Sequence, residues 1–221
     1  MSDTPILQGI DLKKTYQLGR LEVPVLHGAS IQIQARAWTT ILGTSGSGKS
    51  TLLQLLGGII RPTEGDISIM GNSGDSDGTV RQKVAYLGHQ PGVYGELNAL
   101  ENLRFFAELY GQEANESDLD KLLVRFALER AKNRPIRTYS RGMTQRLALA
   151  RMSVQGSDIW LLDEPMTGLD AAGRDIFVEW LNEAKNAGKT IVTITHAADL
   201  LKPSVDRVIT LESGRLKEAV T

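Results

Sequence analysis

One nine-residue stretch constrains the fold of this chain more than any other feature. It reads Gly43-Thr44-Ser45-Gly46-Ser47-Gly48-Lys49-Ser50-Thr51. The stretch follows the apolar run 38–42, which has the length of a buried strand, and it leads into a helical pattern. Its spacing is that of the P-loop, in which glycines let backbone N–H groups surround a phosphate at the N-terminus of a helix. The chain is therefore predicted to be an α/β protein with a phosphate-binding loop.

Each residue from 43 to 51 is a candidate nucleotide-binding residue. Lys49 is placed to reach the β- and γ-phosphates of a nucleotide, and the Ser50 hydroxyl is placed to bind Mg²⁺. The simpler alternative is a glycine-rich turn that contains a lysine by chance. The strand before, the helix after and the complete spacing argue against that alternative.

A second motif supplies the acidic groups that such a site needs. The apolar run 159–162 is followed by Asp163 and Glu164, which matches a Walker B strand. We expect Asp163 to hold Mg²⁺, directly or through water, and Glu164 to polarise an attacking water. Taken alone, the two acidic residues would fit an ordinary acidic loop. Together with the P-loop, they indicate a nucleoside-triphosphate hydrolase.

The order of apolar runs predicts the fold class and the domain organisation. Short apolar runs alternate with longer helical patterns, as in a mostly parallel sheet with crossover helices. We expect strands at 6–12, 29–33, 38–42, 65–70, 84–87, 159–162, 190–195 and 207–211. The alternation at 31–34 is typical of an antiparallel sheet. No repeat or linker divides the chain, so we expect a single domain over 1–221.

Helical patterns dominate one internal segment. Between about 93 and 140 we expect a helix that ends at Gly111 and a second helix that Ser117 opens. A later helix spans 171–187, before Gly188. The prediction is therefore an α/β core with an antiparallel lobe, formed by about 1–92 and 141–221, and an inserted helical subdomain at about 93–140.

Composition and charge exclude several classes of function. The chain has 25 Lys and Arg against 26 Asp and Glu, a formal net charge of −1, so no global basic field is available for nucleic acid. The absence of cysteine excludes disulfides, thiolate zinc sites and cysteine nucleophiles. Neither a signal peptide nor an apolar run of about 18 residues is found. We expect a soluble, cytoplasmic protein that can still dock on a membrane protein.

The three histidines do not form a metal site of their own, because none stands three or four residues from another. His196 ends the predicted strand 190–195. His27 and His89 match no motif, and we assign both a structural role.

The branch of hydrolase is indicated by further motifs. The tetrapeptide Asn-Lys-x-Asp of guanine-binding proteins does not occur. The segment 139–151 resembles the signature motif of ABC ATPases, Leu-Ser-Gly-Gly-Gln, and it precedes the Walker B strand as in that family. Ser140 and Gly142 stand at the family's phosphate-contacting positions, whereas Tyr139, Arg141 and Met143 depart from the motif.

Other landmarks follow in the family's order. Gln90 resembles the Q-loop glutamine, Asp170 the D-loop aspartate and His196 the switch histidine, while Tyr16 resembles the aromatic residue that stacks on adenine. The resemblance implies an ABC-type core related to the RecA fold. It also implies catalytic roles for Glu164, His196, Lys49 and Gln90, and a Mg²⁺ site of Ser50, Gln90 and Asp163.

The resemblance further implies partners and cofactors. Two subunits, either two copies of this chain or one copy and a paralogous ATPase, would close head to tail around two ATP molecules with Mg²⁺. Ser140, Gly142 and Asp170 of one subunit would face the P-loop of the other. The pair would drive separate polytopic membrane permease subunits from the cytoplasmic face of the membrane, as a peripheral protein, with no nucleic acid involved.

Two parts of the chain resemble different branches of the family. The segment 88–110 and the signature are similar to the ATPase of the haem exporter of cytochrome c maturation and to ABC-2 type exporters. Residues 16–19 and 23–26 are more similar to the lipoprotein-release and macrolide-export branch. Two alternatives stay open: a soluble ABC ATPase that acts as an assembly or scaffold factor, and a P-loop kinase.

Overall fold

The computed structural model describes residues 4–73, 80–196, 201 and 203–218. Its larger sheet has six strands in the order β10-β9-β3-β8-β7-β6. Their bounds are β3 (Trp38–Leu42), β6 (Val84–Leu87), β7 (Ile159–Asp163), β8 (Thr190–Ile194), β9 (Arg207–Glu212) and β10 (Arg215–Glu218). Only β10 pairs antiparallel, with β9, and the other neighbours in this sheet are parallel. The predicted α/β class with a mostly parallel sheet is therefore confirmed.

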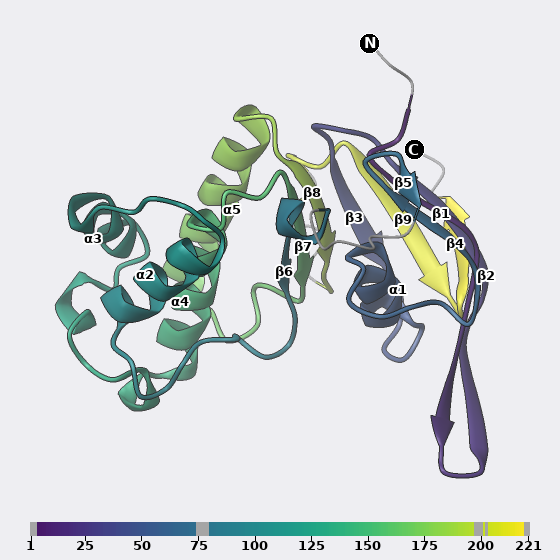
Figure 1. Ribbon diagram of the computed structural model, residues 1–221, viewed down its shortest axis with the longest axis horizontal. Helices are drawn as coiled ribbons and strands as arrows, with labels where there is room; N and C mark the ends of the chain where they lie inside the picture. Colours follow the sequence, from purple (N-terminus) through teal and green to yellow (C-terminus); the bar gives the residue numbers. More distant parts are fainter. Residues whose placement is uncertain (1–3, 74–79, 197–200, 202, 219–221) are drawn as a thin grey trace.

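A smaller antiparallel sheet covers one side of the parallel strands (Figure 1). Its order is β2-β1-β4-β5, with bounds β1 (Leu7–Leu18), β2 (Leu21–Ile33), β4 (Glu64–Ile69) and β5 (Asn72–Ser73). Helix α1 (Lys49–Leu56) packs between the two sheets, because its leucines share one apolar core with Leu7 and Ile33 of the small sheet and with Ile41 and Val192 of the large one. The start of α1 is thereby held at the edge of the parallel sheet.

The other face of the parallel sheet is covered by helices (Figure 1). These are α2 (Ala99–Leu109), α3 (Glu116–Arg125), α4 (Arg141–Ser153) and α5 (Ala171–Asn186), with the 3₁₀ turns η1 (Arg81–Lys83), η2 (Glu129–Ala131) and η3 (Ile136–Thr138). One continuous apolar core runs from Trp160 of β7 through Leu147 of α4 to Leu103 of α2 and Leu123 of α3. The core does not break between the α/β part and the helical part of the chain. The subdomain boundaries at about 93 and 140 therefore stay a prediction.

The β1–β2 hairpin is much longer than expected. We predicted strands at 6–12 and 29–33, but the two strands continue to Leu18 and from Leu21, around a turn at Gly19 with a φ of 64°. The arm extends beyond the rest of the molecule (Figure 1), and Leu18 and Leu21 are 65% and 63% exposed. Since the arm buries little apolar surface, its residues do not need the alternation by which a strand is recognised.

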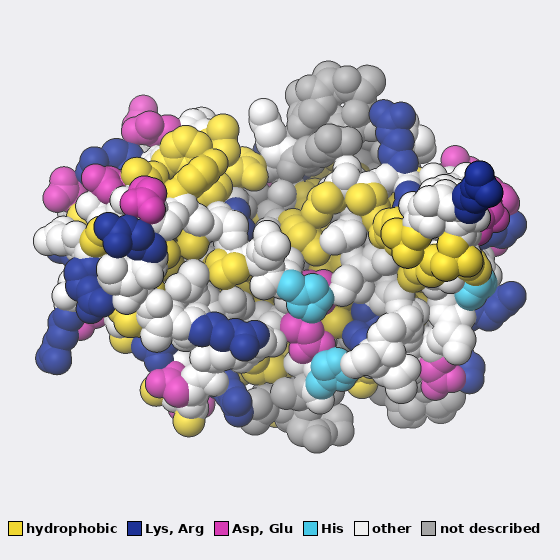
Figure 2. All heavy atoms as spheres, turned by 90° about the horizontal axis from the view of Figure 1, so that it is seen from below, with side chains coloured by type: hydrophobic (Ala, Val, Ile, Leu, Met, Phe, Trp, Pro, Cys, Tyr) yellow, Lys and Arg dark blue, Asp and Glu magenta, His cyan; other side chains and the backbone are white. Residues whose placement is uncertain are grey.

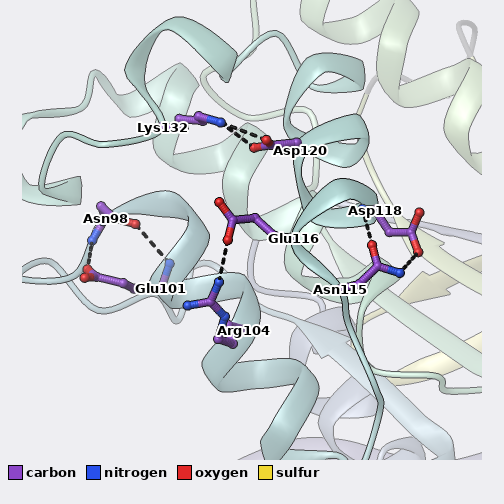
Figure 3. A network of polar contacts seen from close by, with 8 residues as sticks. All are labelled: Asn98, Glu101, Arg104, Asn115, Glu116, Asp118, Asp120 and Lys132. Carbon is purple, nitrogen blue, oxygen red and sulfur yellow. Dashed lines mark hydrogen bonds and ion pairs between the residues drawn. The ribbon is translucent and has the colours of Figure 1, made fainter.

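Figure 3 shows polar contacts at the starts of α2 and α3. Asn98 caps α2 in a capping box with Glu101, and Asn115 caps α3 by accepting from the N–H of Asp118. The prediction that Ser117 opens the second helix is therefore wrong, because Asn115 stands two residues earlier and is at least as good a cap. The ion pair Arg104–Glu116 (3.4 Å) links α2 to α3. The ion pair Lys132–Asp120 (2.7 Å) links the residue after η2 to α3.

A row of aromatic rings packs the helices against the sheet. We expect its disruption to cause a large loss of stability. Phe126 is fully buried, and its ring lies edge-on to the ring of Trp180 of α5, with 5.7 Å between the ring centres. The Trp180 ring stacks on that of Trp160 of β7, with 4.5 Å between the ring centres. We expect Phe126→Ala to lower the free energy of unfolding by about 3–5 kcal/mol, because it opens a cavity in this chain. Urea unfolding monitored by circular dichroism measures the change. The control Val124→Ala, at a 60% exposed position, should change it by less than about 0.5 kcal/mol.

Within the described residues, none of the helices has both the length and the apolar character needed to cross a lipid bilayer.

Candidate functional site

The candidate site lies where the parallel strands end. Strands β3, β6, β7 and β8 are neighbours, so their carboxyl ends meet at one edge of the sheet. The loop 43–48 follows β3, His89 and Gln90 follow β6, and His196 follows β8. Asp163 is the last residue of β7, and Glu164 comes next. Four segments that are distant in the sequence are thereby gathered at this edge of the sheet, next to the start of α1.

The backbone of the loop requires glycine at two positions. Gly43 has a φ of 152°, and a Cβ there would collide with the Leu211 carbonyl oxygen. Gly48, the residue before α1, has a φ of 100°, and its Cβ would lie 3.0 Å from a Leu26 methyl group. Thr44, Ser45 and Gly46 are exposed at the tip of the loop. The loop therefore offers its backbone to a ligand.

Lys49 and the N-terminus of α1 face into this loop. The Lys49 amine donates to the carbonyl oxygens of Gly43 (2.8 Å) and Thr44 (2.9 Å), and the residue is only 7% exposed. No side chain caps α1, so its first N–H groups and the positive end of its dipole are available to an anion. Ser47 has a buried hydroxyl without a hydrogen-bond partner among the described residues. This arrangement suits phosphate groups.

Two other predicted nucleotide-binding residues lie against each other. The Tyr16 hydroxyl is 3.4 Å from the Thr51 hydroxyl, so the long arm of β1 reaches the first turn of α1. The Lys14 amine lies 5.3 Å from the centre of the Tyr16 ring. The structure therefore brings Tyr16 to the same helix that begins with Lys49 and Ser50.

Asp163 has a buried carboxyl group whose oxygens lack a hydrogen-bond partner among the described residues. The residue is 2% exposed. Burial raises the pKa of the nearby Tyr86 hydroxyl, and the Asp163 charge raises it further. A buried carboxylate is stable only when a cation or hydrogen bonds compensate its charge. Since oxygen ligands suit Mg²⁺, Asp163 fits a Mg²⁺ site.

Glu164 is held next to His196. Its φ of 50° lies in the left-handed region, and its N–H donates to the Ile194 carbonyl at the end of β8 (2.9 Å). His196 Nε2 lies 3.3 Å from Glu164 Oε1, at ion-pair distance but without the alignment of a hydrogen bond. Both are predicted site residues, and the structure brings them together. A carboxylate paired with an imidazole can orient a water and accept its proton.

The loop after β6 places His89 close to two predicted Mg²⁺ ligands. His89 Nε2 lies 3.4 Å from the Ser50 hydroxyl and 3.5 Å from Asp163 Oδ2. We assigned His89 a structural role, yet it stands between two predicted Mg²⁺ ligands. Gln90, which we placed in the Mg²⁺ site, is exposed and has no hydrogen bond to Ser50 or Asp163 among the described residues. The only signal for His89 in the sequence was its place beside Gln90.

The signature residues form a second group. Ser140 caps α4 by accepting from the Met143 N–H (3.3 Å). Gly142 touches the segment after β7, because a Cβ there would lie 2.9 Å from the Gly168 carbonyl oxygen. Asp170 caps α5 and also pairs with Arg146 of α4. In the described structure, these three residues have no hydrogen bond to the loop 43–48 of the same chain.

A cavity of about 290 Å³ separates the two groups. Its wall includes His89, Asp163 and Glu164 on one side and Tyr139 and Arg141 on the other. Figure 2 shows histidine side chains beside acidic ones near the middle of the face that is seen from below. The cavity therefore lies between the acidic residues of the site and the signature segment.

The Asp170–Arg146 pair predicts a pH-dependent contribution to stability. Arg146 and then the Gly173 N–H hold the pKa of the Asp170 carboxyl below its ordinary value. The contribution is therefore complete above the unfolded pKa of about 3.9, and it is lost as the pH falls through the lower folded pKa. We expect Asp170→Asn, which keeps a capping side chain, to lower the Tm at pH 7. Thermal unfolding at pH 7 and near pH 3 should show the difference from wild type shrinking in acid, and an equal difference at both would contradict this assignment.

Comparison with known proteins agrees with this geometry. A sequence profile of the family described as "ABC transporter" matches residues 26–167. The chain is 38% identical, over 175 residues, to Cytochrome c biogenesis ATP-binding export protein CcmA 2 of Cupriavidus metallidurans, covering 78% of this chain and 82% of that protein. It is 32% identical to ABC transporter ATP-binding protein NatA of Bacillus subtilis, over 93% of this chain and 85% of that protein.

Solved structures extend the similarity to nearly the whole fold. One is the dimeric, post-hydrolysis state of the ATP-binding cassette MJ0796 bound to ADP and Pi, with a TM-score of 0.87 and 27% identity. The match covers 97% of this chain and 99% of that one. The chain belongs to the ABC transporter family and is an ATP-binding, ATP-hydrolysing cassette of that family.

Proposed function

We propose that this cassette is the ATPase subunit of an exporter that is related to the haem exporters of cytochrome c maturation. The observation that carries the ATPase chemistry is the buried Asp163, whose carboxylate oxygens have no hydrogen-bond partner among the described residues, next to the Glu164–His196 pair. The assignment to export rests on the relatives that are named as cytochrome c biogenesis export proteins, at 38% and 36% identity.

The roles of the site residues follow from their positions. The N–H groups of the loop 43–48 and the Lys49 amine bind the β- and γ-phosphates, while Thr51 and Tyr16 line the nucleoside side. Ser50 and Asp163 hold Mg²⁺, which neutralises charge on the phosphates when it is bound. Glu164 orients the attacking water and accepts its proton, and His196 holds the Glu164 carboxylate in position.

A second subunit completes the site in this proposal. Ser140, Gly142 and Asp170 have no hydrogen bond to the loop 43–48 of their own chain within the described structure, which supports a role toward another subunit. The dimeric state of the MJ0796 cassette supports the same arrangement. Two copies, or one copy and a paralogue, close around two MgATP molecules.

A membrane permease is the proposed recipient of this closure. Tyr94, Phe105, Leu109 and Val124 are exposed large hydrophobic residues, between 38% and 61% exposed, on or beside α2 and α3. Figure 2 shows hydrophobic side chains gathered on the helical side of the molecule. The fully buried Asn102 accepts from the Tyr94 N–H (2.8 Å) and donates to its carbonyl (3.0 Å). In this proposal, the hydrogen bonds between Asn102 and Tyr94 transmit movement of the loop after β6 to this surface. The surface contacts the permease at the cytoplasmic face of the membrane.

The dimer is tested by analytical ultracentrifugation of Glu164→Gln, which retains ATP. We expect a monomer without nucleotide and a dimer with MgATP. Lys49→Ala in the same buffer is the matched control and should stay monomeric. A Glu164→Gln protein that stays monomeric with saturating MgATP would refute the closed pair.

The transport role is tested by purification from membranes of cells that express the tagged chain. Recovery of a polytopic membrane protein, lost when Tyr94 and Phe105 are both changed to Ser, supports the proposal. Recovery with soluble proteins alone would favour an assembly factor. Phosphate transfer from ATP to an acceptor other than water would favour a kinase.

A further inference from the structure

We infer that Arg141 is a catalytic residue that contacts the γ-phosphate of the ATP held by the other subunit of the pair. The inference rests on the proposed closed pair and deepens it. Arg141 stands where the signature motif Leu-Ser-Gly-Gly-Gln has a glycine, which has no side chain. Arg141 therefore adds a positive charge that the motif itself lacks.

The first observation is that the Arg141 guanidinium is unpaired. Arg137 before it pairs with Glu96 (3.2 Å), and Arg146 after it pairs with Asp170. Arg141 is exposed, and its guanidinium has no hydrogen bond or ion pair among the described residues. A guanidinium is always charged, and its planar fork can bind two oxygens of one phosphate. Arg141 is therefore free to bind an anion.

The second observation is the place that the fold gives to the side chain. A Cβ at Gly168 would lie 3.1 Å from Arg141 Cγ and 3.3 Å from its Cδ and Nε, so the stem of Arg141 packs across this glycine. Arg141 also lines the cavity of about 290 Å³ whose wall includes Asp163 and Glu164. The stem is thus held against the segment after β7, at the rim of the proposed site.

The third observation is the electrostatics at the start of α4. Arg141 is its first residue, and no acidic residue stands in its first turn. Because the N-terminus of a helix is already positive, a cation there is unfavourable unless an anion binds. Among the described α-helices, α1 is the other one that begins with a cation, Lys49, and has no acidic residue in its first turn. The proposed phosphate site at α1 therefore has the same combination of charges as the start of α4.

The fourth observation favours an anion on another subunit. Within the described part of the chain, Arg141 forms no ion pair with Asp163 or Glu164 across the cavity. Its neighbours Ser140 and Gly142 have no hydrogen bond there to the loop 43–48 of the same chain. The three residues are consecutive, so in the proposed pair Arg141 faces the same γ-phosphate as its two neighbours.

The reaction shows what this charge does. Water forms a bond to the γ-phosphorus, and the bond from that phosphorus to the β–γ bridging oxygen breaks, with its electron pair going to ADP. Glu164 accepts the proton of the water. A guanidinium at the γ-phosphoryl oxygens stabilises the charge that they carry in the transition state. Because Arg141 reaches ATP only across the interface, it makes fast hydrolysis depend on closure of the pair.

A mixed pair tests whether Arg141 acts on the other subunit. Arg141→Gln keeps most of the stem and removes the charge, so it should lower turnover at least about tenfold, as the loss of one charge-assisted hydrogen bond does. Mixing Arg141→Gln with Glu164→Gln should raise turnover several-fold above the sum of the two variants alone. One site of the mixed pair then combines the intact Glu164 of one chain with the intact Arg141 of the other.

Three controls accompany this experiment. Capture of untagged Arg141→Gln by tagged Glu164→Gln in MgATP shows that the mixed pair forms. Arg130→Gln, at an exposed position in η2, should keep the turnover of wild type. Arg141→Lys keeps the charge without the planar fork and should retain part of the turnover. The Arg141→Gln monomer should bind MgATP as wild type does, because its own loop 43–48 is unchanged.

Several results would overturn the inference. One is turnover in Arg141→Gln that equals or exceeds that of wild type. Another is a captured mixed pair without a gain in turnover, because a residue that acts within its own chain leaves both sites of that pair defective. A mixed pair that cannot be captured, although Glu164→Gln pairs with itself, also counts against the inference. If Glu164→Gln captures no chain at all in MgATP, the closed pair of the proposed function fails instead.

Discussion

Glu164→Gln should lower the turnover of ATP by at least about 10²-fold, while the affinity for MgATP stays within a few-fold of wild type. The glutamine side chain has nearly the same volume, but its amide cannot accept a proton from water at neutral pH. The Glu164 backbone N–H bond to Ile194 is unaffected by the change, so the local fold should be preserved. Steady-state phosphate release and binding of a fluorescent ATP analogue measure the two quantities.

The control for this prediction is Glu116→Gln. Glu116 lies on α3 with a side chain that is 66% exposed, and it contacts Arg104 instead of the site. Its replacement should leave turnover unchanged. Near-normal turnover in Glu164→Gln would mean that another group accepts the proton.

Lys49→Ala should weaken ATP binding by at least about 10²-fold, which equals about 2.8 kcal/mol. In the wild-type protein, we expect the Lys49 amine to make charge-assisted hydrogen bonds to phosphate oxygens, each worth about 1.5–3 kcal/mol. In this structure the amine donates to Gly43 and Thr44, so the substitution also removes two contacts that shape the loop. Isothermal titration with MgATP measures the loss.

Lys121→Ala is the matched control for Lys49→Ala. Lys121 lies on α3 with a side chain that is 74% exposed, next to Asp118. It should bind ATP as wild type does. Retention of normal affinity in Lys49→Ala would contradict the assignment of the loop 43–48 as the phosphate site.

The sequence predicts those parts of the site that are formed by residues next to one another in the chain. The loop 43–48 and the start of α1 form one segment, and Asp163 ends β7 with Glu164 directly after it, so spacing alone identified them. The caps Ser140 and Asp170 are equally local, because each accepts from an N–H three residues later. Such features depend little on the rest of the fold.

The parts that the sequence does not predict depend on contacts between distant segments. His89 approaches Ser50 and Asp163 only because β6 pairs with β7 and α1 packs under the same edge. No local pattern around His89 reports that pairing. The sequence does not predict the arm of β1 and β2 because its residues are largely exposed. It predicts Ser117 as the cap instead of Asn115 because both residue types cap helices.

The left-handed backbone at Glu164 places stability and catalysis in conflict at one position. A residue with a Cβ at a φ of 50° costs about 1–2 kcal/mol relative to a relaxed conformation, a cost that glycine avoids. Random substitution followed by selection for heat resistance alone would therefore favour glycine at position 164 and discard the carboxylate. Engineering of a more thermostable variant of this cassette should keep Glu164. Stabilising substitutions should be sought at other positions, such as on the exposed arm of the hairpin.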